Sequence, residues 1–198
     1  MTKTRLEAFS DGVMAIIVTI MVLELKVPHD SSWSALIELK SILISYVLSF
    51  VGVAIYWVNH HHLIQAIKKV SSGILWSNIN LLFWLSLVPF VTAWMGESHF
   101  ANNTVITYAA NCNCCGLAYF FLLLMIKKSH MQDATILRLI EYQSKKGLIS
   151  TVFYMLSLIV GFFYPTISII IFIIVAMMWV IPDRNIEKLL SSHVIEPE

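Results

Sequence analysis

The sequence predicts an all-α fold, a six-helix transmembrane bundle with both termini in the cytoplasm. Of its 198 residues, 58% are hydrophobic and 13% are charged, and the mean hydropathy is +0.78. Soluble domains carry about a quarter charged residues, so a water-soluble fold of this length would lack the polar surface that it needs. The surplus of apolar side chains is therefore expected to face lipid.

Six apolar stretches have lengths suited to crossing a bilayer, which takes about 20 helical residues. The predicted spans cover residues 12–27, 39–58, 74–95, 105–126, 148–163 and 166–181. The last two divide one long apolar tract at Tyr164-Pro165, because the residue before a proline disfavours helix. Residues 1–198 are expected to form a single membrane domain with no cleaved leader. The polar segment 127–146 is expected to be an interhelical loop or a short surface helix.

The basic residues predict the orientation of this domain. Eleven of the thirteen lysines and arginines fall on one side of the six-span arrangement. They are Lys3, Arg5, Lys68, Lys69, Lys127, Lys128, Arg138, Lys145, Lys146, Arg184 and Lys188. Because positive charge marks the cytoplasmic side, both termini are expected inside the cell. The net charge of +1 argues against a nucleic-acid partner, which needs a concentrated basic surface.

Asp11 is the most informative polar residue near a span, because ionisable groups in membrane helices usually mark function. It has two interpretations. It could cap the start of the first helix together with Ser10, or it could be a buried carboxylate that ties helices together or titrates. Asp11 lies about 100° from the stripe described below, which favours contact with neighbouring helices of the same subunit.

Other polar residues have mainly structural interpretations. The consecutive histidines 60–62 project in different directions from a helix, so they cannot all bind one metal ion. Asn78 and Asn80 are expected to form hydrogen bonds between helices, and Pro89 is expected to kink the third span. The cysteines at positions 112, 114 and 115 are expected to be small helix-packing residues, because no second set of metal ligands is near them.

A narrow stripe runs along the first span. On a helical wheel of about 100° per residue, its members fall within about 60° of one another. They are Gly12, Ile16, Thr19 and Leu23. Any apolar helix offers such a stripe for ordinary packing, and periodicity alone favours that interpretation.

The opening segment of the chain favours a functional role for this stripe instead. Arg5-Leu6-Glu7-Ala8-Phe9-Ser10-Asp11-Gly12 fits the pattern Arg-x-x-x-Phe-Ser-Asp, which resembles the start of the first helix in the transmembrane protein 175 family of potassium channels. Downstream, Trp57-Val58-Asn59-His60 resembles the family's Trp-x-x-His motif, and the segment around Asn78 and Asn80 resembles its third helix. These motifs cover the first half of the chain, whereas the second half matches by hydropathy only.

The resemblance implies a homotetramer in a bacterial or archaeal cell membrane, in which the first helix of each subunit lines a central pore. The implied pore positions are Ile16, Thr19 and Leu23, with a hydrophobic constriction at Ile16. The implied supporting network consists of Arg5, Phe9, Ser10, Asp11, Gly12, Trp57, His60, Asn78 and Asn80. His61 is an open alternative to His60.

The expected function is therefore passive, leak-type conduction of potassium and other monovalent cations, with no enzymatic activity, metal site or cofactor. A small proton-coupled secondary transporter is the alternative, although such folds usually show internal repeats and broken helices near the midplane. A membrane enzyme using Asp11 and the histidines is a third interpretation, and no nucleophile or metal motif supports it.

Overall fold

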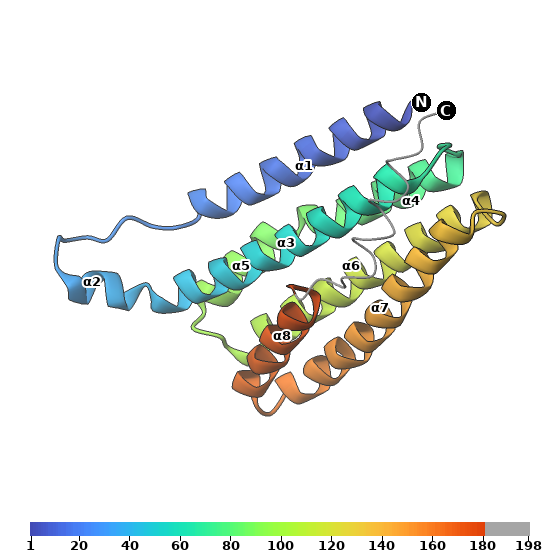
Figure 1. Cartoon of the computed structure of the whole chain (residues 1–198). Helices are drawn as coiled ribbons and strands as arrows, with labels where there is room; N and C mark the ends of the chain where they lie inside the picture. Colours follow the sequence, from blue (N-terminus) through green and yellow to red (C-terminus); the bar gives the residue numbers. More distant parts are fainter. Residues whose placement is uncertain (181–198) are drawn as a thin grey trace.

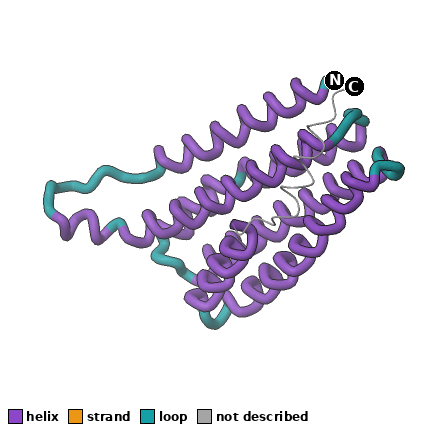
Figure 2. The backbone as a smooth tube through the Cα atoms, viewed as in Figure 1, coloured by secondary structure: helices purple, strands orange, loops and turns teal. Residues whose placement is uncertain are grey.

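The structure, a computed structural model, describes residues 1–180. The prediction of a cytoplasmic C-terminal tail with Arg184 and Lys188 lies outside the described residues, as does the last residue of the sixth predicted span. Within residues 1–180 the fold is entirely α-helical, which confirms the predicted class (Figures 1 and 2). The helices are α1 (Lys3–Leu23), α2 (Trp33–Glu38), α3 (Lys40–Ala66), α4 (Ser72–Ser86), α5 (Val88–Glu97), α6 (Asn102–Ser129), α7 (Ala134–Gly161) and α8 (Pro165–Val180).

Side-chain caps set several helix starts. The hydroxyl of Thr2 accepts a hydrogen bond from the backbone N–H of Arg5, and Ser71 caps α4 in the same way. The carboxylate of Asp133 accepts from the backbone N–H groups of Thr135 and Ile136 at the start of α7. These oxygens satisfy backbone donors that have no partner in the first turn of a helix.

Two prolines explain the breaks between apolar helices. α4 and α5 are interrupted only at Leu87, and Pro89 lies in the first turn of α5. A proline there needs no backbone N–H and cannot continue the preceding helix, so the predicted kink takes the form of a helix restart. Pro165 is the first residue of α8 and directly follows Tyr164, where the predicted division of the last apolar tract falls.

The helices are longer than the predicted spans at their polar ends. α1 begins at Lys3 rather than near residue 12, and α3 continues through the histidines to Ala66. The interhelical loop or short surface helix expected over residues 127–146 is replaced by the ends of two long helices: α6 ends at Ser129, α7 starts at Ala134, and only four residues connect them. A helix that leaves the lipid keeps its backbone hydrogen bonds, so polarity marks the end of a span and not the end of the helix.

The long helices pack side by side as a bundle (Figure 1). α6 lies against α4 and α7, α3 against α5, and α7 against α8. α1 packs on α3, α4 and α5, and Figure 1 shows it along one edge of the bundle. Four segments are long and apolar enough to cross a membrane by length and composition, namely α1, α3, α4 together with α5, and α6. The count of six spans stays a prediction.

One end of the bundle gathers the N-terminus and the links α3–α4 and α6–α7 (Figure 1). The Lys3 ammonium donates to the backbone carbonyl of Gln65 at 2.5 Å, and Lys68 lies 3.4 Å from the Asp133 carboxylate. His130 holds the two links together, since its Nε2 accepts from the backbone N–H groups of Lys68 and Lys69 at 3.2 and 3.4 Å. These bonds place Lys3, Lys68 and Lys69 at a common end of the molecule.

Gly96 provides a stability test, because α5 packs tightly against α3 at this residue. A methyl group at this position would collide with the Ser45 hydroxyl and lie 2.9 Å from the Ile42 Cα atom. Gly96→Ala is therefore expected to lower the free energy of unfolding by about 1–3 kcal/mol, as overpacking does. The matched control is Gly52→Ala, which meets no atom within 4 Å and gains up to about 1 kcal/mol of helix propensity. Thermal unfolding in detergent measures both, and equal midpoints would contradict the close approach.

Candidate functional site

α1 has two distinct faces. The inner face is buried against the bundle and consists of Leu6, Ser10, Met14, Ile17 and Met21. The outer face contains the predicted stripe, in which all four residues are exposed in the isolated chain. The inner residues hold the helix in place, and the outer residues are free to meet lipid or another copy of the chain.

The inner face is fixed by a chain of hydrogen bonds through three buried side chains. The hydroxyl of Ser10 on α1 donates to the carbonyl of Leu6 at 2.9 Å. Because that bond uses its only proton, Ser10 Oγ accepts from Asn78 Nδ2 on α4, also at 2.9 Å. The Asn78 Oδ1 atom then faces His60 Nε2 on α3 at 2.7 Å. The chain joins α1, α3 and α4, and each of the three residues is fully buried.

This order of donors and acceptors assigns the histidine tautomer. Asn78 Oδ1 can only accept, so His60 Nε2 carries the proton and donates it. The buried Nδ1 atom of His60 has no hydrogen-bond partner among residues 1–180. The structure thus places His60, and not His61, against the asparagine of α4.

Asp11 points from α1 toward α3, in the direction that the helical wheel predicts. Its Oδ1 atom accepts a hydrogen bond from the indole nitrogen of Trp57 at 3.0 Å. The capping interpretation of Asp11 is excluded, because α1 begins at Lys3 and is capped by Thr2. Asp11 is therefore a helix-tying carboxylate, only partly shielded from solvent in the isolated chain.

Sequence reasoning missed the rest of this contact surface. Glu7 Oε1 lies 3.2 Å from His61 Nδ1, although the two are not aligned as a hydrogen bond. The His61 ring stacks on Trp57, with ring centroids 5.9 Å apart and an interplanar angle of 25°. Lys3, Glu7 and Asp11 are spaced four residues apart, which puts them on one side of α1. That spacing was the available signal, and it would have predicted a polar edge along α1 but not which helix this edge contacts.

Other implied network residues are not brought together in the isolated chain. Arg5 and Asn80 are exposed, and their side chains form no hydrogen bond or ion pair with the described residues. The Phe9 side chain is 54% exposed. On the helical wheel, Arg5 and Phe9 fall on the outer face of α1, at about the same angle as Ile16. Within residues 1–180, no cluster of three metal-binding side chains occurs.

The outer stripe is apolar apart from one hydroxyl. Ile16 is 58% exposed and Leu23 is 79% exposed. Between them, Thr19 Oγ1 donates to the carbonyl of Ile16 at 2.9 Å. Since this bond uses the hydroxyl proton, the remaining lone pairs of Thr19 Oγ1 are available as acceptors outside the helix. The face can thus offer oxygen ligands to a cation.

Comparison with known proteins identifies the family. The family model described as endosomal/lysosomal potassium channel TMEM175 matches residues 5–89. A protein of Chryseobacterium sp. (strain P1-3), named a potassium channel, is 49% identical over 193 residues, which cover 98% of this chain and 100% of the relative. This chain belongs to the TMEM175 family. The region matched by the TMEM175 model runs from α1 into α5 and contains the whole chain of hydrogen bonds from Ser10 to His60.

Two further TMEM175 relatives extend the comparison. A crystal structure of a lysosomal potassium-selective channel TMEM175 homologue from Chamaesiphon minutus has the same fold, with a TM-score of 0.79. The two sequences are 24% identical, and the match covers 90% of this chain and 96% of the homologue. A chicken protein named endosomal/lysosomal proton channel TMEM175 is 32% identical over 116 residues, which are 52% of this chain and 23% of the relative. The first match shows the fold of nearly the whole chain.

The two asparagines of α4 allow a matched test of the buried network. Asn78→Leu removes both hydrogen bonds and leaves the buried His60 Nε2 donor without its partner, so we expect a loss of about 1–3 kcal/mol in stability. Asn80→Leu is the control, because Asn80 is exposed and makes no side-chain hydrogen bond with residues 1–180. Thermal unfolding of the purified protein measures both variants. Equal losses would show that the network does not hold α1 in place.

Proposed function

We propose that this protein is a passive, potassium-permeable channel in which α1 from each of four subunits lines a central pore. Membership of the TMEM175 family supports potassium conduction, and so do the names of the Chryseobacterium and Chamaesiphon relatives. The observation that carries the proposal for this chain is the outer face of α1, where an exposed apolar stripe surrounds one hydroxyl acceptor.

The packing of α1 suits this role. The helix lies at the edge of the bundle and uses one face to pack on α3, α4 and α5. Ile16 and Leu23 lie near the middle of the remaining exposed arc, between Val22 at one edge and Ile20 at the other. Four copies could therefore bring their stripes together without repacking any subunit. Arg5 and Phe9 share this outward arc, so we assign them to contacts between subunits.

A ring of four Ile16 side chains would form the constriction. An apolar ring excludes water and penalises an ion that must shed its hydration shell. Potassium holds its water less tightly than sodium, so the barrier for potassium is lower. This mechanism gives leak-type conduction with modest selectivity, without a separate filter loop.

Thr19 lies almost one helical turn from Ile16, so four Thr19 hydroxyls would form a second ring. Each hydroxyl proton is held by the Ile16 carbonyl, so the ring would present oxygen lone pairs to the pore axis. These oxygens would replace part of the water that a cation loses at the constriction. The geometry favours a cation over an anion at this level of the pore.

We further propose six membrane crossings, with the N-terminus in the cytoplasm of a bacterial or archaeal cell. The common end that holds Lys3, Lys68 and Lys69 is the basic end, which the positive-inside rule assigns to the cytoplasm. α7 and α8 would supply the fifth and sixth crossings, although α8 has only 16 described residues.

Conduction is tested by reversal potentials of the purified protein in planar bilayers, with potassium on one side and sodium on the other. We expect ohmic currents that favour potassium. Ile16→Asn should raise the conductance roughly tenfold and reduce selectivity, since lowering a barrier by about 1.4 kcal/mol changes a rate tenfold. The control is Val22→Asn, which changes a 45% exposed residue at the edge of the outer arc.

Two outcomes would contradict the proposal. Equal changes in conductance and selectivity in Ile16→Asn and Val22→Asn would show that Ile16 does not form the constriction. Flux that saturates with substrate and follows a proton gradient, with no unitary current from verifiably inserted protein, would favour the proton-coupled transporter instead.

The orientation is tested by labelling introduced cysteines with a thiol reagent that cannot cross the membrane. The background carries alanine in place of Cys112, Cys114 and Cys115. In intact cells, Asp30→Cys should react and Lys69→Cys should react only after permeabilisation. Both residues are exposed, Asp30 in the α1–α2 link and Lys69 in the α3–α4 link, and Figure 1 shows these two links at opposite ends of the bundle. If Lys69→Cys reacted in intact cells and Asp30→Cys only after permeabilisation, the basic end of the bundle would face the outside of the cell.

A further inference from the structure

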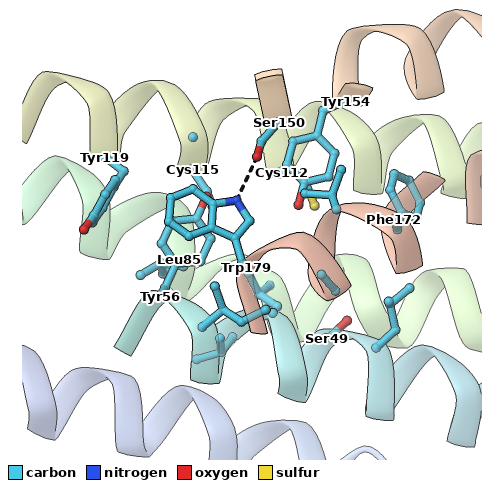
Figure 3. Close-up of a pocket in the computed structure, with 18 of the residues that line it drawn as sticks. Ser49, Tyr56, Leu85, Cys112, Cys115, Tyr119, Ser150, Tyr154, Phe172 and Trp179 are labelled. Atoms are coloured by element: carbon cyan, nitrogen blue, oxygen red, sulfur yellow. Dashed lines mark hydrogen bonds between the residues drawn. The ribbon is translucent and has the colours of Figure 1, made fainter. Parts of the chain in front are cut away.

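A partly open cavity of about 80 Å³ lies between the helices of the bundle and is lined mainly by α3, α6, α7 and α8. No residue of α1 lines it, so it is separate from the proposed pore. Its lining is largely aromatic and aliphatic, and Figure 3 shows the side chains of Tyr56, Tyr154 and Trp179 gathered around it from three helices. Nothing in the conduction mechanism uses this space.

The cavity is drawn out along the helices. Its lining on α3 extends from Leu48 to Asn59 and its lining on α6 from Tyr108 to Tyr119, so each wall is about 16 Å long at 1.5 Å per residue. A small volume over this length describes a slender space. Benzene occupies a cavity of about 150 Å³ in a protein core, so an unbranched chain suits this cavity better than a ring.

Glycines keep the slender space open. Gly52 on α3 and Gly147 on α7 both line the cavity, and a methyl group added at either would meet no heavy atom within 4 Å. Gly116 on α6 also lines it, and its nearest neighbour would be Thr151 Oγ1 at 3.8 Å. Three of the enclosing helices therefore each present a backbone surface without a side chain to the cavity.

Two hydroxyl groups in the lining are without partners. The hydroxyl of Tyr108 is bonded to Ser49 at 3.0 Å, Tyr119 donates to Gln143 at 2.8 Å, and the Trp179 indole donates to Ser150 at 2.8 Å. In contrast, the hydroxyls of Tyr56 and Tyr154 form no hydrogen bond with residues 1–180. Polar groups inside a protein normally have a partner, so these two hydroxyls mark where a polar group of a ligand would bind.

We propose that this cavity binds a slender single-chain amphiphile from the bilayer. Its chain would lie along Gly52 and Gly147, and its hydroxyl or carbonyl head would hydrogen-bond to Tyr56 or Tyr154. The largely apolar lining fits the chain, and the two phenol hydroxyls, which can donate or accept, fit the head. The bilayer supplies such molecules at high local concentration.

The test uses the full-length protein in detergent with n-alkanols from butanol to decanol and a brominated alkanol as a fluorescence quencher. Trp179 lines the cavity, so quenching that saturates and is lost in Trp179→Phe reports occupancy. We expect about fourfold tighter binding for each added methylene, in line with the free energy of burying one such group. The gain should stop once the cavity is full, whereas partition into the micelle alone would continue to rise without saturating.

Single substitutions test whether the alkanol binds in this cavity and which hydroxyl holds its head. Gly52→Leu and Gly147→Leu fill the cavity from different helices, and each should abolish saturable quenching, whereas Gly52→Ala should keep it. Tyr154→Phe should weaken binding about fivefold if its hydroxyl holds the head, as expected for the loss of one hydrogen bond worth about 1 kcal/mol. If Tyr56 holds the head instead, Tyr56→Phe shows this loss. Tyr142→Phe is the control, because Tyr142 packs near Lys146 and does not line the cavity.

Three results would overturn the proposal. The first is quenching that never saturates. The second is saturable binding that persists in Gly52→Leu or Gly147→Leu while the variant is folded. The third is that phenol binds as tightly as an alkanol with the same number of heavy atoms. Correct folding of each variant is checked by its thermal transition. Because the readout is binding and not current, its outcome is independent of whether the pore conducts potassium.

Discussion

The bond chain from Ser10 through Asn78 to His60 fixes the rotation of α1, and the outer face of the molecule depends on that rotation. All three side chains are fully buried, so the loss of one partner leaves a buried polar group without a hydrogen bond. Turning α1 by one residue, about 100°, would break the bond to Asn78 and leave buried polar groups unpaired. The positions of Ile16 and Thr19 on the exposed side are thus set by interactions on the opposite side of the same helix.

A second contact, between α1 and the end of α3, also holds α1 in this rotation, but it lies at the edge of the packed surface. Asp11 accepts from Trp57, and the Trp57 ring stacks on His61, which faces Glu7. These groups are more exposed than the buried chain, so solvent weakens their electrostatic attraction. The buried chain therefore contributes most to the rotation of α1, and the marginal contacts secure its end at the basic side of the bundle.

Hydropathy and helical periodicity were sufficient to predict the helical class, the stripe on α1 and the direction of Asp11, because each depends on local sequence alone. The helix ends were less predictable, since caps such as Asp133 and not polarity decide where α7 begins. Both Asn78 and Asn80 were expected to bond between helices, and one sequence could not show that only Asn78 does so among the described residues. Which asparagine does so depends on how α4 is rotated against its neighbours, and that rotation is a property of the packed bundle.

α3 links the interior cavity to the face that holds α1. Tyr56 lines the cavity and the next residue, Trp57, bonds to Asp11 of α1. Successive residues of a helix point about 100° apart, so one turn of α3 contacts both regions through a rigid backbone. A displacement of α3 at Tyr56 would also move Trp57, the residue that holds Asp11 of α1, because both belong to the same helical turn. The cavity and the support of α1 therefore depend on the same turn of α3, although no residue of α1 lines the cavity.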